Sequence, residues 1–340
     1  MITIKELAKI AGVSRGTIDR VVNRRGRVDK SVEARISKII DEYGYKPNKV
    51  ARALVNRKKL YVVGVISASV NNVFFRDIVE GVRRAEAEMK EFGVSLRYRE
   101  VARFSVPDQL ACIDEMLEEG IDALAINPIN DEAIRGRLKE ADRRGIPVIT
   151  FNSDIEGTDR LAYIGCDYQK TGRIAAGLVA VSCREKANIA VVIGSMKSLG
   201  HHLRVQGFCD EIKKYSGLQV ERVVEMYDDE STSCEKVREL LAEAGEVDAF
   251  FFAAGGKEGG LRAIRESRDG NWPRIVTVDI DPFTASCLRE GLVFATVCQQ
   301  PFVQGYEPVK QLAHFLLYGE KPERAIQYTQ AEIVIRQSIS

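Results

Sequence analysis

Side chains suited to binding polyhydroxyl compounds stand directly after short apolar runs in this 340-residue chain. Planar amides, carboxylates and an arginine follow these runs, and Phe74 and Phe75 stand close to Asn72. Amides and carboxylates are fixed hydrogen-bond donors and acceptors for vicinal hydroxyl groups, and an aromatic ring covers the apolar face of a sugar. The pattern predicts a pocket for a sugar-like ligand, formed by Asn72, Phe74, Phe75, Asn127, Asn152, Asp154, Arg204, Asp279 and Gln299.

Alternating apolar runs and amphipathic segments, which begin near Leu60, must position these residues. Residues 60–66 and 121–127 have the continuous apolar character of buried strands, whereas residues 75–92 and 131–144 have helical spacing and charged exteriors. Repeated β-α units predict parallel sheets covered by helices on both faces. Open α/β sheets bind ligands beyond the carboxyl ends of their strands, and the polar residues stand at those ends.

The number of β-α units predicts two lobes rather than one. A first series spans residues 60–151 and a second spans residues 188–318. We expect the first lobe to comprise residues 60–165 and 292–323. The second lobe is then expected to comprise residues 166–291 and 324–340.

An all-helical segment precedes the α/β region. Thr3 and Glu6 have the spacing of a capping box that starts a helix, Gly12 ends this helix, and Ser14 caps a second one. Apolar residues at helical spacing give both helices one shared core, as in a helix-turn-helix. The outer surface of the second helix, where a recognition helix meets base edges and phosphates, carries Arg15, Gly16, Thr17, Asp19 and Arg20.

Charge is divided unevenly along the chain. Residues 1–60 contain 16 Lys or Arg and 6 Asp or Glu, a net charge of +10, whereas the whole chain has +1 and the remainder therefore −9. A basic segment on an acidic body favours binding of a polyanion. Arg27 ends a basic loop that is suited to lie along a phosphate backbone. A third helix over residues 29–43 completes the head, and Asn48 caps a further helix too short to be stable alone.

These first sixty residues resemble the lactose repressor (LacI/GalR) family of bacterial transcription regulators. The resemblance implies a DNA-binding head at residues 1–46, a hinge helix at 47–59, and an effector-binding and dimerisation domain at 60–340. It also implies that Leu54 enters the minor groove at the dimer centre, where apolar wedges kink the duplex. The motifs that carry it are Leu7-Ala8, Ala11-Gly12-Val13-Ser14, Thr17, Arg20-Val21-Val22-Asn23, Tyr43-Gly44-Tyr45-Lys46-Pro47-Asn48 and Ala51-Arg52-Ala53-Leu54. The DNA-binding residues predicted from position and resemblance are Thr3, Ser14, Arg15, Gly16, Thr17, Asp19, Arg20, Asn23, Arg27, Asn48, Ala51 and Leu54.

The later segments resemble ribose-type sugar-binding proteins related to that family. An aspartate-arginine pair expected after the fourth strand reads Asn152-Ser153-Asp154, and Gly255 replaces an expected asparagine. The effector is therefore expected to be a sugar, cyclitol or related polyol other than simple ribose. The ligand-binding motifs of those proteins fall on Asn72, Phe74, Phe75, Asn127, Arg204, Asp279 and Gln299.

The chain lacks the sequence motifs of several other classes of protein. The chain has no G-x-G-x-x-G after its first strand, no phosphate loop and no Gly-x-Ser-x-Gly elbow, and its three histidines and seven cysteines lack metal-ligand or paired spacing. No apolar stretch approaches the ~20 residues that span a bilayer. We therefore expect a cytoplasmic, nucleoid-associated protein without metal, cofactor or catalytic activity: a ligand-controlled repressor that binds a pseudo-palindromic operator as a homodimer. A carbohydrate-binding module or sugar-processing enzyme remains the alternative.

Overall fold

A computed structural model describes most of the chain. The described residues are 4–22, 28–43, 59–67, 73–102, 105–183, 186–243, 247–267 and 270–339. The predicted hinge helix therefore lies almost entirely outside the described residues. So do seven of the predicted binding residues: Thr3, Asn23, Arg27, Asn48, Ala51, Leu54 and Asn72.

Three helices form the N-terminal head: α1 (Ile4–Ala11), α2 (Arg15–Val22) and α3 (Lys30–Glu42). Gly12 leaves α1 with a φ of 64°, and Ser14 caps α2 by accepting a hydrogen bond from the Thr17 amide at 3.1 Å. Leu7, Ile18 and Ile36, one from each helix, are fully buried against one another. The predicted helix-turn-helix is confirmed. The third helix was expected over residues 29–43, but it spans Lys30–Glu42, and Tyr43 is 49% exposed.

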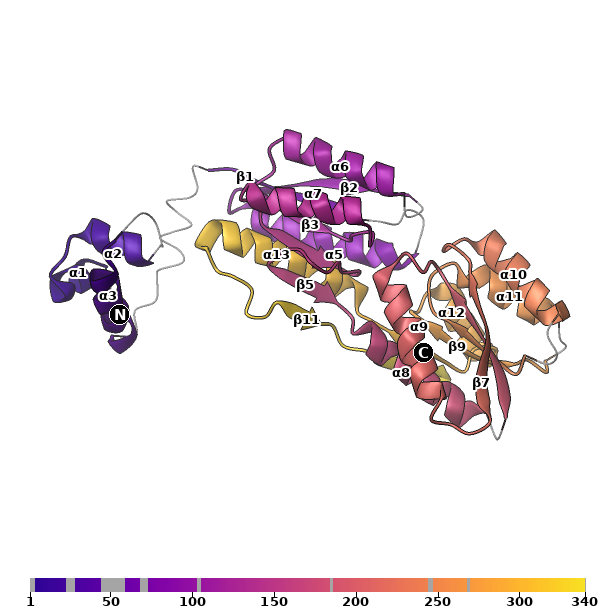
Figure 1. Ribbon diagram of the computed structural model, residues 1–340. Helices are drawn as coiled ribbons and strands as arrows, with labels where there is room; N and C mark the ends of the chain where they lie inside the picture. The colour runs from indigo at the N-terminus through magenta and orange to yellow at the C-terminus, as the bar shows by residue number, and fades with distance from the viewer. Residues whose placement is uncertain are drawn as a thin grey trace.

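The first of two α/β lobes contains a six-stranded parallel sheet (Figure 1). Helices α5 and α13 cover one face of this sheet, and α6 and α7 cover the other. The strands, in spatial order, are β11 (Ile326–Tyr328), β5 (Ala162–Gly165), β4 (Val148–Phe151), β3 (Ala123–Ile126), β1 (Tyr61–Ser67) and β2 (Val94–Glu100). The helices are α5 (Val73–Lys90), α6 (Val106–Glu118), α7 (Glu132–Arg143) and α13 (Pro301–Tyr318).

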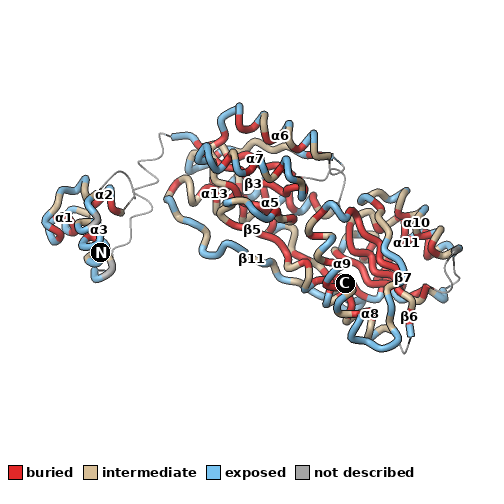
Figure 2. The backbone as a smooth tube through the Cα atoms, in the orientation of Figure 1, coloured by how far each residue is buried: buried red, intermediate tan, exposed pale blue. Residues whose placement is uncertain are grey.

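The second lobe repeats this architecture, except that its edge strand β12 runs antiparallel to β10. Successive strand residues face opposite helix layers: Phe251 packs with α8 and α9, while Phe250 and Phe252 pack with α10, α11 and α12. Figure 2 shows buried strands between helices with exposed outer surfaces. The strand order is β12 (Glu332–Ile335), β10 (Ala295–Cys298), β9 (Arg274–Val278), β8 (Ala249–Phe252), β6 (Ala187–Ile193) and β7 (Leu218–Glu225). The helices are α8 (Tyr168–Ser182), α9 (Leu199–Ile212), α10 (Glu230–Glu243), α11 (Lys257–Ser267) and α12 (Pro282–Glu290).

The predicted lobe boundaries are wrong at two strands. β10 was expected in the first lobe but pairs with β9 of the second, and β11 was expected in the second lobe but pairs with β5 of the first. The chain therefore crosses between the lobes three times, after β5, after β10 and after β11. The physical reason for the error is that an apolar run specifies a buried strand without specifying the sheet to which it belongs.

Glycines allow two pairs of helices to approach closely, and one pair determines where Arg204 lies. A Cβ atom at Gly172 of α8 would overlap the carbonyl oxygen of Arg204 in α9, and a Cβ at Gly207 would overlap the carbonyl oxygen of Gln169. In the first lobe, Gly81 and Gly305 play the same part where α5 crosses α13. The close approach of α9 to α8 places the Arg204 side chain inside the second lobe.

Gly172→Ala should therefore destabilise the protein, because the added methyl group forces α8 away from the backbone at Arg204. Overpacking of this kind costs about 1–3 kcal/mol. Gly177→Ala is the matched control, since a Cβ at this position of the same helix meets nothing within 4 Å. Alanine there should be neutral or stabilise by up to about 1 kcal/mol. Chemical denaturation measures both free energies of unfolding; equal values for the two variants would contradict this account of the helix contact.

Candidate functional site

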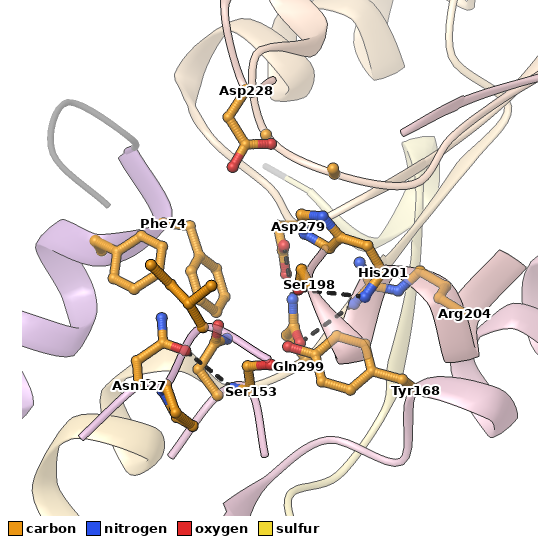
Figure 3. Close-up of a pocket in the computed structure, with 16 residues that line it drawn as sticks. Phe74, Asn127, Ser153, Tyr168, Ser198, His201, Arg204, Asp228, Asp279 and Gln299 are labelled. Atoms are coloured by element: carbon orange, nitrogen blue, oxygen red, sulfur yellow. Dashed lines mark hydrogen bonds between the residues drawn. The ribbon is translucent and has the colours of Figure 1, made fainter. Parts of the chain in front are cut away.

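A cavity lies between the two lobes, at the carboxyl ends of the strands of both sheets. The empty space of the cavity and its opening together is about 530 Å³. Phe74 and Asn127 face Tyr168, His201 and Asp279 across it (Figure 3). Residues of the first lobe that line it are Phe74, Phe75, Asn127, Pro128, Ile129, Asn152 and Ser153. From the second lobe and its crossing segments come Tyr168, Ser198, His201, Arg204, Asp228, Ala254, Gly255, Asp279 and Gln299.

Arg204 is the most deeply buried charged group of the cavity, with 2% of its surface exposed. Its Nε donates to Thr171 Oγ1 at 3.3 Å, Nη1 donates to the Ala253 carbonyl at 2.6 Å, and Nη2 donates to Gln299 Oε1 at 3.3 Å. The guanidinium also lies 4.6 Å from the centre of the Tyr168 ring. These neutral acceptors satisfy the guanidinium N–H groups that donate to them, and the nearby Asp279 carboxyl interacts electrostatically with the Arg204 charge.

Asp279 is linked to Arg204 through Gln299. Gln299 Nε2 donates to Asp279 Oδ2 at 2.9 Å, whereas Asp279 Oδ1 is buried without a hydrogen-bond partner among the described residues. Burial raises the pKa of the Asp279 carboxyl above its ordinary value, although Arg204 and Lys257 oppose the shift. Asp279 also has a φ of 59°, which directs its side chain from the end of β9 into the cavity. The unpaired oxygen is an acceptor for a ligand.

The first lobe contributes a rigid amide and two aromatic rings. Asn127 Oδ1 accepts a hydrogen bond from the Ser153 amide at 3.2 Å, and its amide nitrogen points into the cavity in Figure 3. The Gln109 side chain stabilises this turn, because its Nε2 donates to the Asn127 carbonyl at 3.0 Å and its Oε1 accepts from the Ile129 amide at 2.8 Å. Phe74 and Phe75 meet edge to face, with ring centres 5.4 Å apart. Together they offer a ligand one polar donor and an apolar surface.

Asn152 connects the cavity to the crossing segment between β10 and α13. Asn152 Nδ2 donates to Gln304 Oε1 at 3.1 Å, and Gln304 Nε2 donates to the Gln299 carbonyl at 2.7 Å. The same carbonyl accepts from Thr329 Oγ1 at 2.9 Å, next to the third crossing. Polar groups of both lobes and two crossings are thus joined through Gln299.

Asp154, which the sequence predicted as a ligand contact, does not face this cavity. Arg160 Nε donates to its Oδ1 at 2.7 Å, and Thr150 Oγ1 donates to the same oxygen at 2.7 Å. The physical reason is that the paired side chains close the turn after β4, which leaves Asn152 and Ser153 facing the cavity. The other described residues of the prediction, Phe74, Phe75, Asn127, Asn152, Arg204, Asp279 and Gln299, do line it.

Several lining residues were not assigned from the sequence, among them Tyr168 and Asp228, and for His201 the sequence left a ligand contact and a helix cap as alternatives. His201 Nδ1 accepts from the Ser195 amide at 3.1 Å, so the ring proton of the neutral form resides on Nε2. Burial, together with the Arg204 charge, lowers the pKa of His201 to about 3, so the ring is an uncharged donor near neutral pH. Tyr168 follows β5, a strand that the apolar pattern did not reveal. Asp228 follows β7, and that position was a usable signal.

The head presents the predicted recognition residues on one helix. Ser14, Arg15, Gly16 and Arg20 are exposed, while Thr17 and Asp19 are half-buried. Thr17 Oγ1 lies 2.9 Å from Ser14 Oγ, so these two side chains stabilise the start of α2. The DNA-contacting roles of these six residues stay predictions.

Groups of metal-ligating side chains and membrane-spanning helices were sought in the part of the chain that the structure describes. Among those residues, no group of three or more His, Cys, Asp or Glu side chains is arranged to hold a metal ion. No helix within the described ranges is both long and apolar enough to cross a bilayer.

Comparison with known families decides the class of the protein. Residues 3–48 match the family described as bacterial regulatory proteins, lacI family, and residues 63–321 match the periplasmic binding protein domain. The N-terminal head belongs to the lacI family of bacterial regulatory proteins, and most of the chain belongs to the periplasmic binding protein domain family. The predicted family and fold class, a helix-turn-helix head with a two-lobed α/β domain, are confirmed. The protein is therefore a ligand-responsive transcriptional regulator.

Most of the chain is similar to curated proteins and to solved structures. Catabolite control protein A of Priestia megaterium is 28% identical over 271 residues, covering 79% of this chain and 78% of the relative. The ribose import binding protein RbsB of Bacillus subtilis is 26% identical over 272 residues, covering 79% and 86%. Among solved structures, the glucose-galactose binding protein GanP of Geobacillus stearothermophilus superposes with a TM-score of 0.76 at 24% identity, covering 82% of this chain and 98% of GanP. A solute binding protein of Bacillus halodurans with bound myo-inositol has a TM-score of 0.75 at 21% identity, covering 82% and 95%. The structural likenesses show the fold.

Asp279→Asn should stabilise the ligand-free protein at neutral pH. An aspartate whose pKa is raised by folding makes the folded state less stable once the pH exceeds its ordinary pKa, because ionisation is easier in the unfolded chain. The gain from asparagine should disappear as the pH falls below the ordinary range of aspartate, where the carboxyl is protonated in both states. Thermal unfolding across this pH range measures the difference.

Asp281→Asn is a control that should change the stability of the protein in the opposite direction. Burial raises the pKa of Asp281, but Lys257 at 2.9 Å and the Thr284 amide outweigh it and hold the pKa below its ordinary value. Removing this carboxylate should destabilise the protein at neutral pH. If Asp279→Asn also destabilises the protein at neutral pH, folding does not raise the pKa of the Asp279 carboxyl.

Proposed function

We propose that this regulator is a cytoplasmic, nucleoid-associated repressor without catalytic activity. It binds a pseudo-palindromic operator as a homodimer, and a sugar, cyclitol or related polyol in the cavity between its lobes sets its affinity for that operator. The observation that carries the proposal is the composition of the cavity. Fixed amide, carboxylate and guanidinium groups face two phenylalanine rings, an arrangement suited to a ring compound with hydroxyls at its edge.

The position of the cavity explains how a ligand changes DNA binding. Asn127 belongs to the first lobe, Asp279 to the second, and Gln299 to a crossing segment, so one ligand contacts all three. A ligand shifts an equilibrium between lobe arrangements only when it binds them with different affinity. A cavity whose walls come from two lobes meets this condition, because its contacts depend on how the lobes are placed.

Some proteins similar to this chain carry a sugar in their names, and some solved structures of this fold hold a polyhydroxyl compound. The relatives include a sucrose operon repressor of Streptococcus mutans and a regulator named catabolite control protein A. Solved structures of this fold hold D-arabinose and myo-inositol. These ligands differ in ring size and substituents, so they support a polyhydroxyl effector for this chain without specifying one.

DNA recognition is assigned to the head, the hinge helix and a pair of subunits. The predicted contacts beyond the described residues, among them Arg27, Asn48 and Leu54, belong to this assignment. Symmetric half-sites require a two-fold protein, and a hinge segment too short to be a stable helix alone needs its counterpart in the other subunit. Effector binding then acts by altering the spacing of the two hinge segments.

Residues 1–59 should account for operator binding. A gel shift on the DNA upstream of the protein's own gene should show a specific complex whose affinity falls by about 10³–10⁵ between 50 and 200 mM salt, as for a contact with roughly 6–10 phosphates. Deleting residues 1–59 should abolish the complex. The truncated protein should still bind its effector, because the cavity residues all lie beyond the deletion. Affinity that is insensitive to salt would contradict the assignment.

Leu54→Ala should remove the bend in the operator and most of the specificity. Without its apolar side chain the hinge no longer unstacks a base step, whereas the basic head retains salt-dependent, non-specific binding. A bending assay compares the variant with the parent on the same operator, with Leu60→Ala, an exposed position outside the predicted hinge, as the control. Equal bend angles and specificity ratios for Leu54→Ala and the parent would show that Leu54 is not a wedge.

A further inference from the structure

Two hydrogen-bonding atoms of the cavity wall are buried without a partner among the described residues, and they belong to different lobes. One is Asp279 Oδ1 in the second lobe, and the other is Ser153 Oγ in the first. Figure 3 shows Asp279 across the cavity from Ser153. Buried polar groups are nearly always hydrogen-bonded, so two open groups that line one cavity indicate that its ligand is their partner.

The backbone around Ser153 holds its side chain in the cavity wall. Ser153 follows Asn152, which has a φ of 59° directly after β4. The Ser153 amide donates to Asn127 Oδ1 at 3.2 Å, and only 4% of the residue is exposed. Because the amide is fixed, only rotation about the Cα–Cβ bond moves the hydroxyl oxygen.

The turn that contains Ser153 is closed by other side chains. On one side, Arg160 Nε donates to Asp154 Oδ1 at 2.7 Å. On the other side, the Tyr163 hydroxyl donates to the Asn152 carbonyl at 2.8 Å. The Ser153 hydroxyl makes no hydrogen bond to any described part of this turn. A role in stabilising the turn therefore does not explain why serine stands here.

Neutral hydroxyl groups are suitable partners for both open atoms. An ionised Asp279 only accepts, so it needs a donor, whereas the Ser153 hydroxyl either donates or accepts. An alcohol does all of this without adding charge to the cavity. A ligand that enters a polar cavity displaces water, and it must replace the hydrogen bonds that the water made.

We propose that Ser153 is a specificity-determining ligand contact, and that the effector bridges the lobes through two of its hydroxyl groups, one at Ser153 Oγ and one at Asp279 Oδ1. This inference rests on the proposed function, since it assigns two hydroxyls of the polyol in the same cavity. Both bonds form only when the lobes are placed so that the ligand reaches both residues, and the effector therefore favours that arrangement. A compound that lacks either hydroxyl leaves a buried group unpaired and binds weakly.

Ser153→Ala tests first whether the hydroxyl serves the fold or the ligand. Thermal unfolding of the ligand-free variant should have the same midpoint as the parent or a higher one, because the lost hydroxyl has no protein partner. Thr277→Val is the matched control for binding: Thr277 Oγ1 is also buried without a partner in the described ranges, but Thr277 does not line the cavity. Only Ser153→Ala should weaken the ligand.

Calorimetric titration of the full-length protein measures the ligand contact. The probes are D-glucose, D-galactose, D-arabinose, myo-inositol and scyllo-inositol, and the tightest of them is then compared with its monodeoxy analogues, each of which lacks one hydroxyl group. Ser153→Ala should lower the affinity of the tightest polyol about 2–12-fold, the contribution of one hydrogen bond. One monodeoxy analogue should bind the parent about 5–150-fold more weakly than the polyol does, because it leaves the serine unpaired.

A cycle of protein and ligand changes identifies the hydroxyl that Ser153 contacts. The analogue that lacks this group should bind Ser153→Ala and the parent equally within about twofold, whereas the other analogues should still lose affinity. Asp279→Asn weakens the second acceptor by removing its charge. Its effect should disappear for a different analogue, because Asp279 contacts a different hydroxyl group.

Each outcome decides between the inference and the function beneath it. A lower unfolding midpoint for Ser153→Ala, unchanged affinity of this variant for the tightest polyol, or one and the same hydroxyl coupled to both residues would overturn the inference. A polyol that binds and changes operator affinity would still uphold the proposed function. If the predicted coupling is found but no bound polyol changes operator affinity, the proposed function alone is overturned. Failure of every polyol to bind at its solubility limit would overturn both.

Discussion

Hydrogen bonds of Gln299 connect the cavity to a segment in which the chain passes from one lobe to the other, and the proposed coupling between ligand and lobe positions depends on this connection. The Gln299 side chain accepts from Arg204 and donates to Asp279 in the second lobe, while its carbonyl accepts from Gln304, which in turn is bonded to Asn152 of the first. It stands directly after β10, where the chain crosses between lobes. The polar groups that we propose as ligand contacts are therefore bonded to the segment in which the chain passes between the lobes.

This arrangement requires polar groups deep in an apolar domain, and the surrounding packing makes it possible. Arg204 is buried, yet Gly172 brings α8 close enough for Thr171 and Tyr168 to contact the guanidinium. Asn152 and Asp279 adopt positive φ values at strand ends, a conformation that costs about 1–3 kcal/mol per residue in general and less for Asn and Asp. This conformational cost occurs at strand ends whose side chains line the cavity.

Much of this architecture was predictable, because the residues that start and end helices and the apolar runs of buried strands indicate the same elements. The head was recognisable from Gly12 and Ser14, whose roles in ending and starting helices depend on their own chemistry. The strands β1, β3 and β8 were recognisable because they are buried on both faces. Most of the candidate ligand contacts followed from one rule, that parallel sheets bind at the carboxyl ends of their strands.

The sequence predictions differ from the structure where the structure depends on contacts between distant residues, which a local pattern does not contain. β5 is four residues long and α8 has small apolar residues on more than one side, so neither gave a clear period. The partner strands of β10 and β11 are set by long-range pairing, which composition does not encode. Asp154 was assigned by position alone, and its pairing with Arg160 depends on a turn whose geometry the sequence does not reveal. Asp228 was overlooked because an aspartate in a loop after a strand usually caps a helix or faces solvent.

The central claim is that ligand and operator are coupled through the two-lobed domain, and coupling of this kind is reciprocal. The most direct test measures the affinity of the full-length protein for its effector twice by calorimetry, free in solution and saturated with operator DNA. We expect the two dissociation constants to differ by a factor of about 5–150, and the effector to change operator affinity by the same factor in the same direction. Identical effector affinities in the two states would contradict the account.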